Sequence, residues 1–199
     1  YEISACLVGS EMCIRDSDFT VIGNTTPRYQ YTINGSIGWK GLNLRLMFQG
    51  VGKRDWNPGT APYFWGWSSY AQATVFTQHL DYWTPENTDA YYPKPYMHTA
   101  GGIGIYQNRN MQTSDRYLQN AAYIRLKNVT LSYDLPKSIV SHVGLDKVQV
   151  FFTGENLWTS TKLAKMYDPE AIFTSNTYTG EGGKNYPMNK VISFGLIVN

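Results

Sequence analysis

Aromatic side chains are the residues of this chain whose type and spacing suggest binding chemistry. The 199 residues include 16 Tyr, 8 Phe and 6 Trp, and a dense group of rings lies between positions 63 and 83. Flat apolar rings with polar edges can stack on sugar rings or cover part of a protein interface. They can equally pack a segment against itself. The candidate contacts with a ligand or a covering protein are Trp65, Trp67, Tyr70 and Trp83.

Residues that could carry covalent or metal chemistry do not form a recognisable site. Asp168 and Glu170 could be imagined as a calcium pair or as glycosidase carboxylates, but a role in shaping a loop is the simpler interpretation. The sequence has no Gly-rich phosphate loop and no nucleophile motif. We therefore assign no catalytic residue, metal ligand or cofactor and expect no enzyme activity. The histidines, which lack ligand spacing, are His79, His98 and His142.

The charge of the chain is nearly balanced. Lys and Arg number 17 against 15 Asp and Glu, a formal net charge of +2, whereas nucleic-acid-binding domains carry a basic patch. We expect no nucleic-acid partner. No stretch approaches the ~18 uninterrupted apolar residues of a membrane-spanning helix, which excludes a helical membrane protein but not alternating membrane strands.

Alternating residues predict a β-hairpin in the first quarter of the chain. Between Tyr29 and Trp39 the odd positions are mostly large and apolar and the even ones mostly polar, and the phase inverts after Lys40-Gly41. Successive side chains of a strand point to opposite faces, so a two-residue turn would bring both apolar sets to one face. The predicted cross-strand pairs are Trp39 with Leu42, Ile37 with Leu44, Gly35 with Leu46 and Ile33 with Phe48.

Three further strands are predicted, and a helical turn with Pro136 near its start and an end around Gly144 joins the first two of them. Phe151 is an apolar exception on the polar face of the second. Because five strands cannot close a barrel that holds a lumen, we expect more strands before Asp18. The predicted ranges run from near Tyr117 to Tyr133, from Lys147 to Trp158 and from Val191 to Val198.

The apolar face of these strands is suited to a bilayer. Each hairpin strand has about ten residues, enough to cross a bilayer when tilted, and Tyr29, Tyr31 and Trp39 lie near its ends, where aromatic girdles occur. A soluble β-sandwich also alternates, but one tight turn combined with long loops is typical of outer-membrane barrels. The residues predicted to face lipid are Ile33, Ile37, Trp39, Leu42, Leu44, Leu46, Phe48, Ile192, Phe194 and Leu196.

Residues 1–17 differ in character from the rest of the chain. They contain both cysteines, Cys6 and Cys13, at a spacing that fits no common zinc or redox motif. The run from Cys6 to Ser17 resembles translated sequencing-adapter sequence. We expect residues 1–17 to be non-native and residues 18–199 to be natural protein sequence.

Short motifs follow one another in a fixed order along residues 18–199. Each is weak alone, but in this order they resemble the C-terminal part of the SusC/RagA family of TonB-linked outer-membrane transporters. Among them are Gly38-Trp39-Lys40-Gly41, Phe48-Gln49-Gly50-Val51-Gly52-Lys53-Arg54-Asp55, Trp83-Thr84-Pro85-Glu86-Asn87, Gly154-Glu155-Asn156-Leu157-Trp158-Thr159 and Tyr167-Asp168-Pro169-Glu170.

This resemblance implies an all-β fold in which the predicted strands are the last five or so of a 22-stranded antiparallel transmembrane β-barrel. Residues 51–116 and 159–189 would be long extracellular loops of a barrel in the outer membrane of a Gram-negative bacterium. The whole protein would import an oligosaccharide, or in some relatives an oligopeptide. Its partners would be a SusD-like surface lipoprotein, outer-membrane lipid and, through an N-terminal part, the TonB complex. The alternative is a soluble or surface-anchored all-β carbohydrate-binding module.

Overall fold

The computed structural model describes residues 2–6, 19–59, 61–66, 75–95, 113–172 and 186–199. It divides into two compact units. The sheet unit comprises Pro27–Arg54, Ala121–Lys162 and Met188–Asn199, and the loop unit comprises Tyr1–Thr26, Asp55–Asn120 and Leu163–Pro187. Among the described residues, no helix has the length and apolar character needed to cross a membrane.

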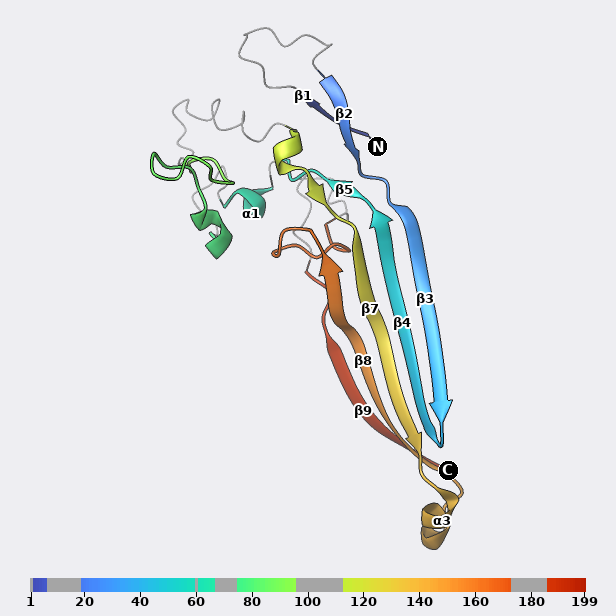
Figure 1. The fold of residues 1–199 in the computed structure, drawn as a ribbon. Coiled ribbons are helices and arrows are strands. Elements are labelled where there is room, and N and C mark those ends of the chain that lie inside the picture. Colours follow the sequence, from blue (N-terminus) through green and yellow to red (C-terminus); the bar gives the residue numbers. More distant parts are fainter. Residues whose placement is uncertain (1, 7–18, 60, 67–74, 96–112, 173–185) are drawn as a thin grey trace. The chain divides into compact units, whose positions relative to one another are not determined.

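The sheet unit is a single antiparallel sheet of five strands in the order β3-β4-β7-β8-β9 (Figure 1). Within this sheet each strand pairs with the next one along the chain, so the prediction of five adjacent antiparallel strands is confirmed. The third strand begins at Tyr123 and not near Tyr117, because a 3-10 turn and a short separate strand occupy the intervening residues. The five strands are β3 (Arg28–Trp39), β4 (Leu42–Lys53), β7 (Tyr123–Asp134), β8 (Val148–Thr161) and β9 (Val191–Val198).

The hairpin of β3 and β4 has the predicted register. Lys40 and Gly41 form its two-residue turn with φ angles of 47° and 86°, as in a type I′ turn, whose twist matches that of the flanking strands. All four predicted pairs are present: Trp39 with Leu42, Ile37 with Leu44, Gly35 with Leu46 and Ile33 with Phe48.

The predicted helical turn between β7 and β8 is also present. It consists of α3 (Lys137–Val140) and the 3-10 turn η4 (Ser141–Val143), and Gly144 ends it in a left-handed conformation at φ 72°, the usual role of glycine after a helix. The Asp134 amide donates to the Gly41 carbonyl at 2.9 Å, which joins this connection to the β3–β4 turn.

A β-bulge interrupts the regular pairing in β7. Lys127 lies between Leu126, which pairs with Phe48 of β4, and Asn128, which pairs with the adjacent Met47. A bulge adds one residue to a strand and shifts its alternation. Opposite Lys127, β8 carries two residues, Asn156 and Leu157, and Asn156 takes a positive φ of 53°.

Phe151, the apolar exception in the sequence, lies over a glycine. It pairs with Gly195 of β9, and a Cβ atom added at Gly195 would overlap the Phe151 ring. An aromatic ring that covers a cross-strand glycine replaces the side-chain contacts that the glycine lacks.

Replacing Gly195 with alanine should therefore destabilise the sheet by about 1–3 kcal/mol, the usual cost of overpacking. Gly35→Ala is the matched control, since a Cβ at Gly35 meets nothing within 4 Å and alanine restricts the unfolded chain more than glycine. Thermal unfolding of both variants in detergent measures the difference. Equal stability of the two variants would show that the packing of Phe151 does not require a glycine at position 195.

The loop unit contains two short strand pairs and several single turns. The strand β1 (Glu2–Cys6) pairs antiparallel with β2 (Phe19–Asn24), and β5 (Asp55–Trp56) pairs with β6 (Gln119–Asn120). Neither of these two strand pairs was predicted from the sequence. The turns of the loop unit are α1 (Pro62–Trp65), η2 (Thr77–Leu80) and η3 (Asp115–Tyr117).

The expectation that residues 1–17 are non-native stays a prediction. The strand β1 comes from this segment, but residues 1 and 7–18, including Cys13, lie outside the described residues. Pairing of β1 with β2 shows only that the segment can extend along a strand edge.

Candidate functional site

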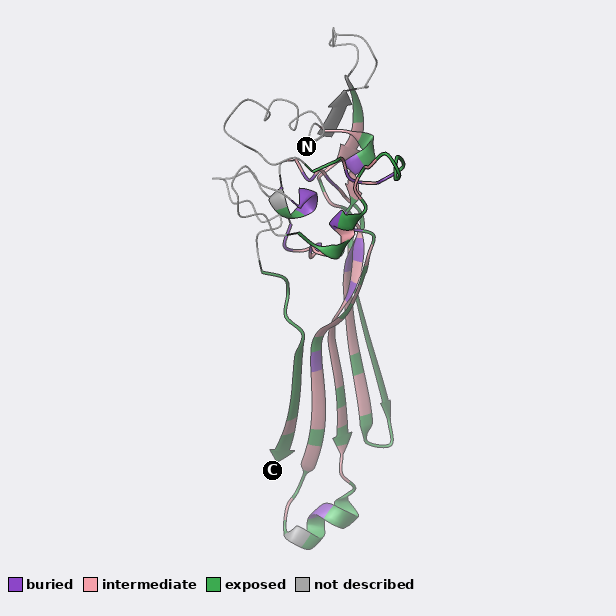
Figure 2. Cartoon of the chain, turned by 90° about the vertical axis from the view of Figure 1, so that its left-hand side faces the viewer, coloured by how far each residue is buried: buried purple, intermediate pink, exposed green. Residues whose placement is uncertain are grey.

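The sheet unit has one apolar face, built from rows of residues that pair across the strands. Figure 2 shows its outer strands, β3 and β9, as exposed along most of their length, whereas the three inner strands are mostly intermediate. The rows contain the residues predicted to face lipid. Three of them are Trp39–Leu42–Tyr133–Val150–Leu196, Ile37–Leu44–Leu131–Phe152–Phe194 and Gly35–Leu46–Val129–Gly154–Ile192.

Large apolar side chains on this face are exposed. The exposed fraction is 71% for Ile37, 78% for Phe194 and 60% for Ile192. Contiguous apolar surface of this extent marks a contact with a partner or a membrane. Burying one such side chain is worth about 1.5–3 kcal/mol, so the face as a whole favours an apolar surrounding.

The opposite face of the sheet is mainly polar. Arg125 of β7 is only 3% exposed there, and its Nε donates to Thr159 Oγ1 of β8 at 2.8 Å. A sheet with one apolar and one polar face is what the wall of a barrel with a polar interior requires. The rows of the polar face include Ser36–Arg45–Thr130–Thr153–Ser193 and Asn34–Met47–Asn128–Glu155–Val191.

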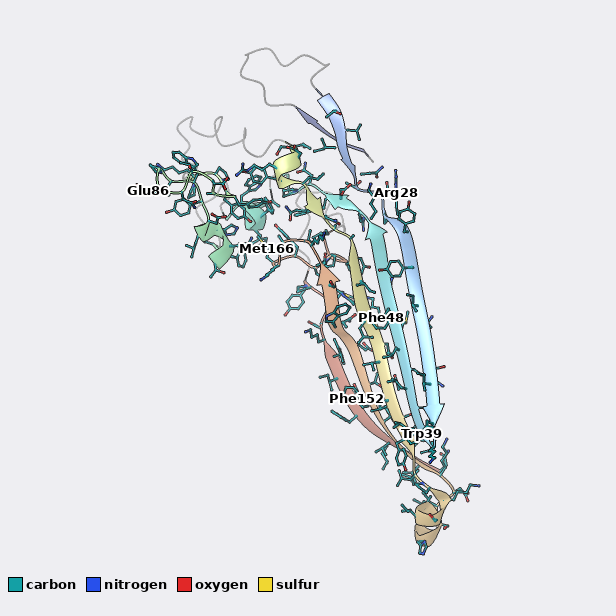
Figure 3. All side chains as sticks on the ribbon, viewed as in Figure 1. Arg28, Trp39, Phe48, Glu86, Phe152 and Met166 are labelled. Carbon is teal, nitrogen blue, oxygen red and sulfur yellow. The ribbon has the colours of Figure 1, made fainter. Side chains whose placement is uncertain are left out.

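Aromatic residues lie near both ends of the sheet. Trp39, 67% exposed, lies at the turn end of β3, far from Arg28 at the other end of the strand (Figure 3), and the Lys40 ammonium sits 4.9 Å from its ring centroid. Tyr31 and the half-exposed Trp158 lie toward the loop end. Trp39 lies eight positions after Tyr31, roughly 27 Å along a strand at about 3.4 Å per residue. This length is comparable with the apolar band of about 25 Å in outer-membrane barrels once tilt is included.

The two faces can be distinguished by introducing one charge. Leu46→Arg should cost about 2–4 kcal/mol in a bilayer, because Leu46 is on the apolar face near mid-strand, where an arginine would contact lipid. Arg45→Gln, on the polar face of the same strand, is the control and should cost little. Unfolding by urea in lipid vesicles measures both free energies. Equal tolerance at the two positions in inserted protein would contradict the assignment of faces.

The loop unit has a core of aromatic rings. Phe64 of α1 lies at its centre with 0% exposure, and its ring centroid is 5.0 Å from that of Trp65, 5.7 Å from that of Tyr92 and 6.2 Å from that of Tyr117. The rings meet edge to face, the arrangement that aromatic quadrupoles favour. The aromatic cluster, as we call it, comprises Trp56, Phe64, Trp65, His79, Tyr91, Tyr92, Tyr117 and Tyr167.

The predicted contact residues of the loop have different positions. Trp65 is 4% exposed, its Nε1 donates to the Gly59 carbonyl at 2.8 Å and its ring packs on Tyr117, so it has the packing role that was the alternative interpretation. Trp83 is 41% exposed and its ring remains available for contact. Trp67 and Tyr70 lie outside the described residues.

Two tyrosine hydroxyls of the aromatic cluster have hydrogen-bond partners within the loop unit. The Tyr92 hydroxyl accepts from Gln78 Nε2 at 3.1 Å, and the Tyr91 hydroxyl accepts from Gln119 Nε2 at 3.0 Å. Burial raises the pKa of both phenols above the usual tyrosine value, so both stay protonated at neutral pH. The cluster is therefore an uncharged packing core.

The candidate acidic and metal-binding residues have local structural contacts. Asp168 Oδ1 accepts from the Glu170 amide at 2.9 Å, an Asx turn consistent with loop shaping. His142 is exposed and its Nδ1 lies 2.6 Å from the Ser138 carbonyl oxygen. His98 lies outside the described residues. Within the part of the chain that the structure describes, no three His, Cys, Asp or Glu side chains form a group that could hold a metal ion.

Known proteins share this arrangement of strands over nearly the whole chain. No protein-family profile matches the sequence of this chain. It is 29% identical over 190 residues to TonB-dependent receptor P3 of Formosa agariphila, and 27% identical over 193 residues to TonB-dependent receptor P26 of the same organism. The alignments cover 92% and 93% of this chain but 17% and 18% of those relatives.

A solved structure of the RagAB peptide transporter superposes with a TM-score of 0.65 at 25% identity, over 92% of this chain and 19% of that chain. The chain is similar to the TonB-dependent receptors. The resemblance inferred from the motifs is thereby confirmed. The RagAB peptide importer in its 'open-open' state matches with a TM-score of 0.60 at 23% identity, over 97% of this chain and 20% of that one.

The sheet unit thus corresponds to a fragment of a β-barrel transporter. The chain spans less than a fifth of the length of the curated TonB-dependent receptors that it matches, so the total of 22 strands stays a prediction. The relatives are named as receptors and transporters, and none of these names denotes an enzyme.

Proposed function

We propose that this chain forms part of the wall and the outer loops of a TonB-dependent importer in the outer membrane of a Gram-negative bacterium. The observation that carries the proposal is the sheet with one apolar and one polar face, whose rows continue across all five strands. Similarity to TonB-dependent receptors over 92% of the chain supports it. The protein would move its cargo without making or breaking a covalent bond.

Two kinds of cargo remain candidates. The family resemblance favours an oligosaccharide, whereas the solved relative at 25% identity is named as a peptide transporter. We propose nutrient import with an oligosaccharide or an oligopeptide as cargo. Energy would come from the TonB complex through a part of the whole protein outside this chain.

Uptake by cells that carry the full-length protein tests this proposal. Labelled oligosaccharides and oligopeptides should be taken up only when the TonB complex is intact, and loss of that complex should abolish uptake. The cargo class whose uptake disappears identifies the substrate. If uptake of both classes is unchanged, and the chain instead binds glycans as a water-soluble protein, the carbohydrate-binding module is the better account.

The loop unit is the proposed contact for a SusD-like surface lipoprotein or for the cargo. Trp83 supports this, because its ring is exposed while its amide is fixed by a hydrogen bond to the Tyr92 carbonyl at 2.9 Å. Because the backbone at Trp83 is already anchored, little backbone ordering remains to oppose binding. Exposed tryptophans of this kind often dominate an interface.

Trp83→Ala should weaken lipoprotein co-purification or ligand affinity by roughly 5- to 30-fold, the effect of losing 1–2 kcal/mol at an interface. Trp39→Ala, which removes an exposed ring at the turn end of the sheet, is the matched control and should change neither. Pull-down and equilibrium binding with the whole transporter measure both. Unchanged values for Trp83→Ala would remove Trp83 from the contact surface.

A further inference from the structure

His79 is a buried ionisable side chain inside the aromatic cluster. It lies in η2, is 7% exposed, and its ring centroid is 5.1 Å from that of Tyr92 and 5.7 Å from that of Phe76. Buried polar groups are costly unless every donor and acceptor is satisfied. Histidine is also the side chain whose ordinary pKa lies closest to physiological pH.

Both ring nitrogens of His79 have backbone partners. The Phe76 amide donates to Nδ1 at 2.9 Å, and Nε2 lies 3.0 Å from the Phe64 carbonyl oxygen. Because an amide can only donate, Nδ1 must be the unprotonated nitrogen, and Nε2 must carry the proton that it donates to the carbonyl. The two contacts thus define a neutral ring with one tautomer.

These contacts connect separate segments of the loop unit. Phe64 belongs to α1, Phe76 precedes η2, and the chain turns beneath the ring at Gly66, which has φ 71°. A Cβ atom at Gly66 would lie 2.7 Å from the His79 ring, so only glycine allows this approach. His79 therefore links η2 to α1 through Nε2, while Nδ1 caps the start of η2 through the Phe76 amide.

Titratable and charged groups in the segments around the ring have other partners. The ring of Tyr63 in α1 lies 6.3 Å from that of Phe76, and the Tyr92 hydroxyl accepts from Gln78 Nε2. The Asp81 carboxylate accepts from Asn87 Nδ2 and from the Tyr91 amide, both at 3.2 Å, and Arg116 donates to the Ala90 carbonyl at 2.6 Å. None of the described carboxylates hydrogen bonds to His79, so within the described residues a protonated ring has no carboxylate partner.

We propose that His79 is an acid-sensitive latch, which holds α1 and η2 together while its ring is neutral and releases the aromatic cluster when Nδ1 gains a proton. A proton on Nδ1 would face the Phe76 N–H, and two donors cannot share a hydrogen bond. The ring or residue 76 must then move, which disturbs the contact of the His79 ring with Tyr92. Tyr92 packs on Phe64, and Phe64 packs on Trp65, so the disturbance reaches the Trp65 ring. This inference goes beyond import and does not depend on the cargo.

The direction of the pH dependence follows from the burial of the ring. Desolvation lowers the pKa of His79 below its ordinary value despite the backbone hydrogen bonds, so the open form, with a pKa near 6.5, binds the proton more tightly. The closed cluster is therefore fully stable above about pH 6.5 and is weakened as the pH falls below it. The ratio of closed to open forms should drop by up to about tenfold per pH unit until the pKa of the closed form is reached.

The test uses the full-length protein in bilayers, labelled with 15N-histidine and 5-fluorotryptophan. Nitrogen NMR follows protonation of His79, and the 19F signal of Trp65, assigned with Trp65→Phe, reports exposure of the cluster to a water-soluble paramagnetic quencher. Between pH 7.5 and 4.5, Trp65 should become quenchable in step with protonation of His79 Nδ1, at a midpoint below pH 6.5. His142→Gln removes the exposed histidine of the sheet unit and should leave this transition unchanged.

Two neutral replacements isolate the latch. In His79→Asn the side-chain amide oxygen can accept from the Phe76 amide, and in His79→Gln the side-chain amide nitrogen can donate to the Phe64 carbonyl. Neither side chain gains a proton in this pH range. In a variant whose aromatic cluster is closed at pH 7.5, Trp65 should therefore stay protected to lower pH than in the wild type. If either variant opens at the same pH as the wild type, the proposal is wrong. If the aromatic cluster of both variants is already open at pH 7.5, the wild-type protein alone tests the proposal. Protonation of His79 without exposure of Trp65, or an exposure midpoint above pH 6.5, would then overturn the proposal.

Discussion

The two-residue period of a strand is the constraint on which the sheet unit depends. A slip of one residue would move every apolar side chain of a strand to the opposite face, so each strand must keep its register for the rows to form. The type I′ turn at Lys40-Gly41 sets that register for β3 and β4. In β7, the bulge at Lys127 brings Leu126 and Val129, three positions apart, opposite Phe48 and Leu46 of one apolar set.

The same bulged region also positions the last strand. Asn156 takes the left-handed conformation that asparagine tolerates better than most residues, and its Nδ2 donates to the Asn189 carbonyl at 3.1 Å. Asn189 lies two residues before β9, so this contact ties the start of β9 to β8. Farther along the same two strands, the Phe151 ring of β8 packs over Gly195 of β9. The last strand pair of the sheet is thus fixed by local contacts between neighbouring strands.

Alternation and turn chemistry made most of the sheet predictable. The hairpin register, the turn ending at Gly144 and the three later strands all follow from residues close in sequence. The start of β7 was not predictable, because β6 pairs with β5 across more than sixty residues and short strands leave no periodic signal. For the same reason the aromatic cluster was missed as a unit: Phe64, Tyr92 and Tyr117 carry no common spacing. The sequence identified Trp65 as aromatic but could not show that its ring is buried.

Contact of the apolar face with lipid is the central claim, and a spin-label scan of β9 tests it most directly. Each residue from Val191 to Val198 except Gly195, which lies under the Phe151 ring, is replaced in turn by a labelled cysteine in the full-length protein. The protein is inserted in vesicles, and collisions of each label with oxygen and with a water-soluble nickel complex are measured. The account predicts a two-residue period, in which labels at Ile192, Phe194 and Leu196 meet oxygen and labels at Ser193 and Ile197 meet nickel. Equal access along the strand, or the opposite phase, would contradict it.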